Sequence, residues 1–269
     1  MNFEAEWLPD ARRYYTNIVG KYGPQVQDVL KKAGGIDIQM LCPLHGPIWR
    51  KDLGWFIDKY VKWSSYTPEE EAVMVMYGSV YGGTENAARV LASQLSQGGL
   101  RNVAVYDVSK THVSELIAEA FRCSHLVAAS ITYNMDIFTP MKNVLHDFVA
   151  HNLQNRRFAL IENGSWSPAA GGKMQEIFSA MTGMQQLGDT LTIHSTTDEQ
   201  SFQALQALAG TILSDFGQAA PVPAAAEEIG KTTQWVCTVC GYIAEMEELP
   251  EDYTCPVCGV GRDKFKKVE

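Results

Sequence analysis

Apolar and polar residues alternate with two different periods along the middle of this chain. Five short apolar runs have the length and composition of buried strands; they are residues 72–78, 102–108, 125–131, 156–163 and 187–195. Apolar residues at helical spacing predict helices near 84–97, 112–122, 139–152, 171–182 and 198–216. Strands that alternate with helices predict an α/β fold, a doubly wound five-stranded parallel sheet with helices on both faces.

Two polar stretches divide the chain into parts. TPEEE precedes the first apolar run, and QAAPVPAAAEEIGKTT has the proline, alanine and charge content of a linker between domains. The expected parts are an amino-terminal part at 1–66, a central domain at 67–217, the linker at 218–233 and a small domain at 234–269.

Composition narrows the classes of partner. The formal net charge of −9 argues against nucleic acid or an anionic membrane as a partner, because both would repel the chain. No stretch approaches the roughly 18 apolar residues of a membrane span. The first residues lack the basic start and apolar core of a secretion signal, so we expect a cytoplasmic location.

Three loops of unusual composition follow the first, third and fourth predicted strands: GSVYGGTEN (78–86), SITYNMDIFTP (130–140) and ENGSWSPAAGG (162–172). In a doubly wound sheet, ligands bind beyond the carboxyl ends of the strands, where these loops meet. In the first loop, Gly82 and Gly83 let backbone N–H groups approach an anion, and Ser79 and Thr84 add hydroxyl donors at a helix start. The loop contains neither GK[ST] nor GxGxxG, which argues against a nucleoside triphosphate or a dinucleotide.

Two aromatic residues occur in the other loops, Tyr133 in the second and Trp166 in the third. A planar ring system could stack between them while backbone groups bind its polar edge. The alternative is that each aromatic packs against its own loop and that the glycines form a turn before a capped helix. The convergence of three such loops on one sheet edge favours a ligand site.

The last part of the chain carries two CxxC pairs, Cys237 with Cys240 and Cys255 with Cys258. Each pair places two thiolates on a tight turn, and two such turns close a tetrahedral site of four sulfurs. Zinc and iron both accept this set of donors.

GSVYGGTEN, SITYN and NGSW resemble the flavin loops of flavodiiron proteins, which are A-type flavoproteins that pass electrons from FMN to a diiron centre. LPEDYTCPVCGVGRDKF resembles rubredoxin with a shortened loop between its knuckles, which implies iron. The resemblance implies that the FMN phosphate is held by Ser79, Val80, Tyr81, Gly82, Gly83 and Thr84. It implies that the flavin ring lies among Thr132, Tyr133, Asn134, Asn163, Gly164, Ser165 and Trp166.

Residues 1–66 predict helices near 11–22, 25–33 and 51–65 and one strand, IDIQML, at 36–41. DARRYYTNIVGKYG and CPLHGPIWR resemble the end of the metallo-β-lactamase-like domain of flavodiiron proteins, which implies that His45 ligates iron. The chain has no HxE motif, so the diiron centre is incomplete and an apolar face of this part is expected to stay open. Either the chain is a fragment, or a separately encoded partner supplies the missing diiron domain.

The expected function is electron transfer of the flavorubredoxin type, in which an NAD(P)H-dependent rubredoxin reductase-like protein feeds Fe(Cys)4, then FMN, then a diiron site that reduces O2 or NO. The resemblance also implies a homodimer. Whether this chain is itself an oxidoreductase depends on the missing diiron domain. The alternatives are an interaction module with zinc in the four cysteines and a stand-alone flavin-dependent reductase.

Overall fold

The computed structural model describes residues 3–218, 234–246 and 248–267. The chain divides into two compact units, Met1–Pro221 and Val222–Glu269, and each is described by itself. The predicted linker at 218–233 lies outside the described residues except for its first position. Among the helices that the structure describes, none is long and apolar enough to cross a membrane.

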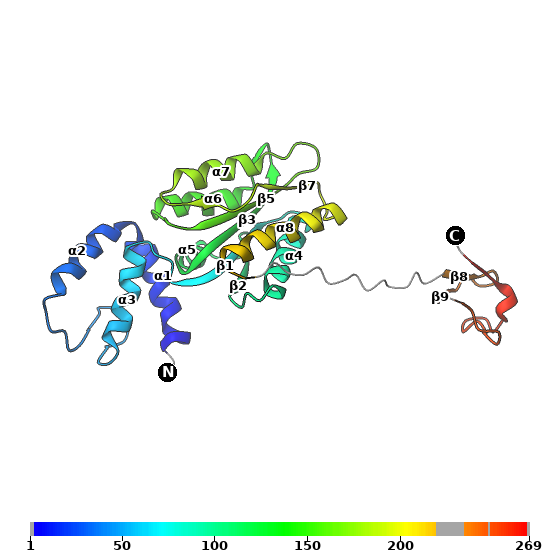
Figure 1. The fold of residues 1–269 in the computed structure, drawn as a ribbon, viewed down its shortest axis with the longest axis horizontal. Coiled ribbons are helices and arrows are strands. Elements are labelled where there is room, and N and C mark those ends of the chain that lie inside the picture. The colour runs from blue at the N-terminus through cyan, green and yellow to red at the C-terminus, as the bar shows by residue number, and fades with distance from the viewer. Residues whose placement is uncertain (1–2, 219–233, 247, 268–269) are drawn as a thin grey trace. The chain divides into compact units, whose positions relative to one another are not determined.

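A parallel sheet forms the centre of the larger unit, as the alternating pattern predicts (Figure 1). Its strands are β1 (Glu70–Gly78), β2 (Val103–Asp107), β3 (Cys123–Tyr133), β5 (Arg157–Asn163) and β6 (Gln185–Gln186), in the order β2-β1-β3-β5-β6. Of the fifth predicted strand, 187–195, only β7 (Leu191–Ile193) is extended, and β6 lies just before the predicted range; the two pair separately with β5. Gly188 lies between these two pieces with φ +66°, a left-handed conformation that interrupts an extended run.

Helices cover both faces of this sheet. Buried residues of α4 (Gly83–Gln97) and α8 (Glu199–Asp215) pack with Val73 and Val75 of β1. Buried residues of α5 (Val113–Arg122), α6 (Thr139–Ala150) and α7 (Ala170–Ala180) pack with Met74 and Met76. Successive β1 residues therefore enter opposite cores, which is why this strand is apolar at nearly every position. A short strand, β4 (Asp136–Ile137), pairs antiparallel with the last two residues of β3, Thr132 and Tyr133.

The amino-terminal part is helical. It consists of η1 (Phe3–Trp7), α1 (Leu8–Val19), η2 (Gly20–Tyr22), α2 (Gly23–Ala33) and α3 (Leu53–Ser64). The predicted helices are present, but the strand predicted at 36–41 is wrong: only an isolated bridge joins Leu41 to Trp49. A strand needs a hydrogen-bonded neighbour, and the described residues offer this segment no other. Residues 1–66 were expected to be an α/β remnant, but within the part of the chain that the structure describes they contain helices and no strand.

A buried group of charges ties these helices to the sheet. Glu69, immediately before β1, accepts hydrogen bonds from Arg12 of α1 at 2.6 Å and from Trp63 of α3 at 2.8 Å. Lys59 of α3 lies 3.3 Å from the same carboxylate. Burial raises the pKa of Glu69, but Arg12, Trp63 and Lys59 outweigh it, so this pKa lies below its ordinary value.

The amino-terminal part also exposes many large apolar side chains. Half of the exposed large apolar side chains among the described residues belong to residues 1–66, a quarter of the chain. Leu44 is 98% exposed, and Ile18, Val29, Ile36 and Ile48 are all more than half exposed. The open apolar face expected from the sequence stays a prediction, and these exposed side chains are consistent with it. Single exposed apolar residues are normal in proteins, but here a quarter of the chain carries half of them.

The smaller unit is a three-stranded antiparallel sheet. Its strands are β8 (Gln234–Cys237), β9 (Ile243–Glu245) and β10 (Phe265–Lys267), in the order β10-β8-β9, with the short helix η3 (Arg262–Lys264) before β10. Phe265 packs edge-on against Tyr253, and the indole N–H of Trp235 donates to the Met246 carbonyl at 3.2 Å. These aromatics form a small core beside the cysteines.

Candidate functional site

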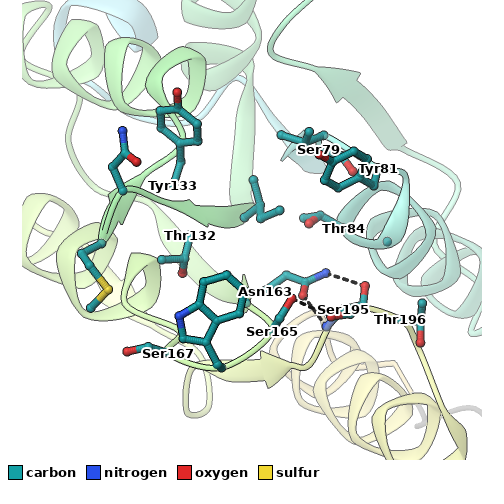
Figure 2. A pocket seen from close by; sticks show the side chains of 17 residues that line it. Ser79, Tyr81, Thr84, Thr132, Tyr133, Asn163, Ser165, Ser167, Ser195 and Thr196 are labelled. Atoms are coloured by element: carbon teal, nitrogen blue, oxygen red, sulfur yellow. Dashed lines mark hydrogen bonds between the residues drawn. The ribbon is translucent and has the colours of Figure 1, made fainter.

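A cavity of about 600 Å³ lies where the loops that follow the carboxyl ends of the parallel strands meet (Figure 2). Its volume is within the range of sites for small ligands and cofactors. Of the predicted flavin residues, those lining it are Ser79, Val80, Tyr81, Gly83, Thr84, Thr132, Tyr133, Asn134, Asn163, Gly164, Ser165 and Trp166. Gly82 is the one predicted flavin residue that does not line the cavity. It forms the turn before α4, where its φ is +90°.

The start of α4 fits an anion. The Ser79 hydroxyl accepts from the Gly82 N–H at 3.1 Å, so it helps to shape the turn. Thr84 is 1% exposed, and its buried hydroxyl oxygen has no hydrogen-bond partner, although the residue lines the cavity. A buried hydroxyl without a partner carries a desolvation cost that a phosphate oxygen would remove. Together with the free N–H groups of the helix start, this is a suitable cradle for a phosphate.

The cavity has no charged wall. None of the described residues that line it is an Asp, Glu, Lys or Arg. A bound phosphate would therefore be held by hydroxyl and N–H donors and by the helix dipole. Neutral donors of this kind bind an anion by geometry rather than by opposite charge.

Three aromatic side chains stand at the cavity with much of their surface exposed: Tyr81 is 94% exposed, Trp166 90% and Tyr133 49%. Tyr133 packs edge-on against Phe138 of its own loop, with ring centroids 6.1 Å apart. Tyr81 and Trp166 are almost fully exposed, which argues against the interpretation that these two rings only pack their loops. A planar ligand would bury part of this surface.

Sequence reasoning missed five lining residues: Ile131, Met135, Ser167, Ser195 and Thr196. Two of them belong to a fourth loop, which follows β7. The last predicted strand, 187–195, included His194 and Ser195, whereas β7 ends at Ile193. The polar run HSTT (194–197) was the available signal for a loop at this point. The short strands β6 and β7 left that part of the sheet weakly defined in the sequence.

The four cysteines of the smaller unit converge. Their sulfur atoms all lie within 4.8 Å of one another, with Cys237 and Cys258 at 3.7 Å and Cys240 and Cys255 at 3.5 Å. Metal–sulfur bonds of about 2.3 Å in a tetrahedron place the sulfurs about 3.8 Å apart, so this donor set fits one metal ion. Cys237 and Cys255 are buried, whereas Cys240 and Cys258 face the solvent.

The knuckle turns prepare these sulfurs for ligation. Gly241 and Gly259, each directly after a CxxC pair, have φ of +77° and +73°, which glycine adopts without strain. Burial raises the pKa of the Cys255 thiol, but the N–H groups of Cys258 and Val257 point at its sulfur and outweigh burial, lowering the pKa to about 7. At Cys255 the thiolate, which is the form that binds metals, is thereby favoured. At Cys240 and Cys258 a backbone N–H also lowers the pKa, but burial and the neighbouring thiols outweigh it and raise the pKa.

Two family models match this chain: Flavodoxin over residues 75–206, and the rubredoxin-like domain of rubrerythrin over residues 235–266. Curated relatives include the anaerobic nitric oxide reductase flavorubredoxins of Aeromonas hydrophila and Shigella flexneri, 22% and 20% identical, and each match covers 98% of this chain and 61% of the relative. The chain belongs to the flavodiiron and flavorubredoxin family.

Solved structures of this family share the fold. The rubredoxin:oxygen oxidoreductase of Desulfovibrio gigas matches with a TM-score of 0.70 and 24% identity, over 77% of this chain and 52% of that protein. The flavodiiron protein of Giardia intestinalis matches with a TM-score of 0.67 and 20% identity, over 76% of this chain and 51% of that protein. The chain corresponds to the carboxyl-terminal portion of its homologues and spans about three fifths of the length of the flavorubredoxins it matches.

For a member of this family, the flavodoxin domain implies FMN, and the four cysteines are a rubredoxin-type metal site. His45 is exposed, and its ring lies 5.5 Å from that of Tyr14. Within the described residues, the cysteine cluster is the only group of three or more His, Cys, Asp or Glu side chains close enough to share a metal ion. The role of His45 as a diiron ligand stays a prediction.

Proposed function

We propose that this chain is the electron-relay portion of a flavorubredoxin-type protein. Electrons would enter from an NAD(P)H-dependent rubredoxin reductase-like protein at iron held by Cys237, Cys240, Cys255 and Cys258. They would continue to FMN in the cavity and then to a diiron site, which is separate from the cluster of four cysteines. Iron exchanges one electron at a time, whereas FMN can store two electrons. The flavin could therefore collect two electrons that arrive singly through the iron.

One observation carries this proposal: a single chain combines an uncharged, aromatic-walled cavity at a helix start with four cysteine sulfurs that lie within 4.8 Å of one another. In the proposed role, Ser79 and Thr84 bind the phosphate, and Tyr133 and Trp166 contact the ring and restrict its access to water. In the knuckles, N–H groups directed at the sulfurs, such as those of Val257 and Cys258 at Cys255, stabilise the thiolates and so influence the reduction potential of the metal.

The terminal acceptor is part of the proposal. The names of the relatives support nitric oxide or oxygen, because some are nitric oxide reductases and one is a rubredoxin:oxygen oxidoreductase. A further polypeptide segment would supply the rest of a diiron domain, and His45 would then be one of its ligands. The apolar surface of residues 1–66 supports such a partner, because covering it would remove exposed apolar area from water. A homodimer is proposed on the family resemblance.

A second candidate follows from the donor set itself. Four cysteine thiolates also form structural zinc sites, so the smaller unit could be a zinc module that contacts another protein. In that case the chain would carry no redox-active metal.

Absorption spectroscopy and metal analysis of the purified full chain, expressed with iron and zinc both available, separate the two candidates. The relay predicts flavin bands together with ferric-thiolate charge-transfer absorption, and about one iron per chain by mass spectrometry of metals. Zinc in the four cysteines would favour the interaction module, and a chain that lacks flavin as well as iron would contradict the relay outright.

A further inference from the structure

Asn163 is the last residue of β5, and both polar atoms of its side-chain amide form hydrogen bonds with the backbone of Ser195 in the loop after β7. Its Nδ2 donates to the Ser195 carbonyl at 3.1 Å, and its Oδ1 accepts from the Ser195 N–H at 2.9 Å. Asn163 is only 2% exposed, so water competes little for these bonds. Such a two-point contact sets both the position and the orientation of the Ser195 backbone.

Ser195 needs this support. Its φ is +68°, a left-handed conformation that is unfavourable for any residue other than glycine and less so for asparagine or aspartate. A residue keeps such a conformation only where its surroundings hold it. The amide of Asn163 supplies two hydrogen bonds to this one residue, and the Ser165 hydroxyl lies 2.9 Å from the Ser195 hydroxyl.

Ser195 also contacts the start of α4. A Cβ atom placed on Gly83 would clash with the Ser195 carbonyl oxygen, so this position accepts only glycine at the observed spacing. The loops after β1, β5 and β7 are therefore joined at a single residue. Figure 2 shows Asn163, Ser165 and Ser195 together beside Thr84, with the two Asn163 bonds drawn as dashed lines.

We infer that Asn163 is a positioning residue rather than a direct flavin ligand, and that it holds Ser195 and Thr196 as a fourth wall of the cavity, where their hydroxyls contact the phosphate of the nucleotide. The phosphate end follows from the packing of Ser195 against Gly83, the first residue of the proposed phosphate cradle. The inference rests on the proposed binding of FMN.

The test compares FMN with riboflavin, which lacks the phosphate, in fluorescence titrations of the apo form of the full chain. In Asn163→Ala, loss of two buried hydrogen bonds should weaken FMN binding about ten-fold or more. Riboflavin binding should change much less, because the aromatic loops keep their own contacts. The circular dichroism of the bound flavin should differ from wild type, which a simple loss of global stability would not produce.

Two further variants separate positioning from folding. Ser195→Gly removes the hydroxyl while easing the left-handed backbone, so the apo protein should be at least as stable as wild type and yet bind FMN several-fold more weakly. Asn17→Ala is the matched control: its amide also bonds two carbonyls, those of Arg13 and Ser114, but between α1 and α5. It should lower stability and leave the FMN dissociation constant within about two-fold of wild type.

The outcomes are distinguishable. If wild type fails to bind FMN, the proposed function is wrong at its first step. If wild type binds FMN but Asn163→Ala and Ser195→Gly bind it equally well, the function stands and this inference is wrong. Equal weakening of FMN and riboflavin in both variants would also overturn it, because the phosphate end would then not be what Ser195 contacts.

Discussion

At the scale of single residues, the metal site is the most self-contained feature of this protein. Every sulfur comes from a knuckle of four residues, and Gly241 and Gly259 close the two turns by donating to the Cys237 and Cys255 carbonyls at 2.9 and 2.8 Å. Because the cluster contains only cysteines from the smaller unit, its chemistry does not draw on the flavin cavity for ligands. The two sites should therefore respond separately to mutation.

Replacement of Cys255 by serine tests this separation. Cys255 is buried, and a serine hydroxyl is a far weaker ligand for iron or zinc than a thiolate, so the metal content should fall to a small fraction of one per chain. Bound FMN should remain at the wild-type level. Metal analysis and the flavin absorption of the same sample give both values. A simultaneous loss of flavin would contradict the assignment of the two sites to separate units.

At the scale of elements, the start of α4 concentrates the binding of a phosphate in one helix turn. Thr84 offers an unpartnered buried hydroxyl, and the N–H groups before it are those that a helix leaves without internal partners. The double variant Ser79→Ala with Thr84→Val removes both hydroxyls while keeping the shape at position 84. We expect FMN affinity to fall by about ten-fold or more and metal content to stay unchanged, measured by titration and by metal analysis. The reverse pattern would refute the phosphate assignment.

The junction between α1, α3 and β1 depends on one carboxylate. Glu69 has no exposed side-chain surface, and Arg12 is also buried. Glu69→Gln leaves the largely buried Lys59 without its anionic partner and leaves Arg12 with only the more distant Glu119, at 3.7 Å, so it should lower the free energy of unfolding by about 3 kcal/mol in urea titrations near neutral pH. Thermal unfolding of Arg13→Ala, whose ion pair with Glu115 is exposed, is the control and should change little.

The pH dependence of this junction has a defined sign. The pKa of Glu69 in the fold lies below that of an unfolded glutamate, which is about 4.3. Its contribution is therefore complete above that pH and is lost as the pH falls through the lower, folded value. The difference in unfolding free energy between wild type and Glu69→Gln should shrink in acid. A difference that stays constant down to the acid transition would show that the charge of Glu69 is not what matters.

At the scale of the whole molecule, each unit has its own core. The larger unit buries two apolar layers against its sheet, and the smaller one packs Phe265, Leu249 and Ala244 around the buried cysteines. Because the smaller unit has its own core and its cysteine cluster draws on no other residues, we expect it to bind its metal without a contribution from the larger unit. The proposed relay then depends on exchange between the units rather than on a shared site.

Exchange is testable with the full chain loaded with iron and FMN. When a purified NADH-dependent rubredoxin reductase supplies electrons, the flavin absorption of wild type should decrease with turnover of NADH. In Cys255→Ser, which is expected to keep FMN but lose iron, flavin reduction should slow by at least about ten-fold, because the one-electron entry point is gone. Equal rates in the two proteins, followed by stopped-flow spectroscopy, would mean that the reductase feeds the flavin directly.

Much of this organisation is readable from the sequence, for physical reasons. Buried parallel strands must be apolar on both faces, so β1, β3 and β5 stand out as runs, and a tetrahedral sulfur site requires the paired CxxC spacing. The loop residues after β1, β3 and β5 are conspicuous because glycines, hydroxyls and an exposed tryptophan have no reason to cluster there otherwise. The strand expected at 36–41 failed because strand formation depends on a neighbour that local pattern does not reveal.

The amino-acid sequence by itself determined where the two sites of this protein lie, the cavity at the edge of the parallel sheet and the cluster of four cysteines. It did so because apolar periodicity and cysteine spacing are local properties of the chain. Only the tertiary structure decided how the cavity is closed, since the contact of Asn163 with Ser195 joins residues 32 positions apart. The same holds for the buried Glu69, which meets Arg12 from 57 positions away. Hydrogen bonds and charges act through space, so their partners are chosen by the fold and not by proximity along the chain.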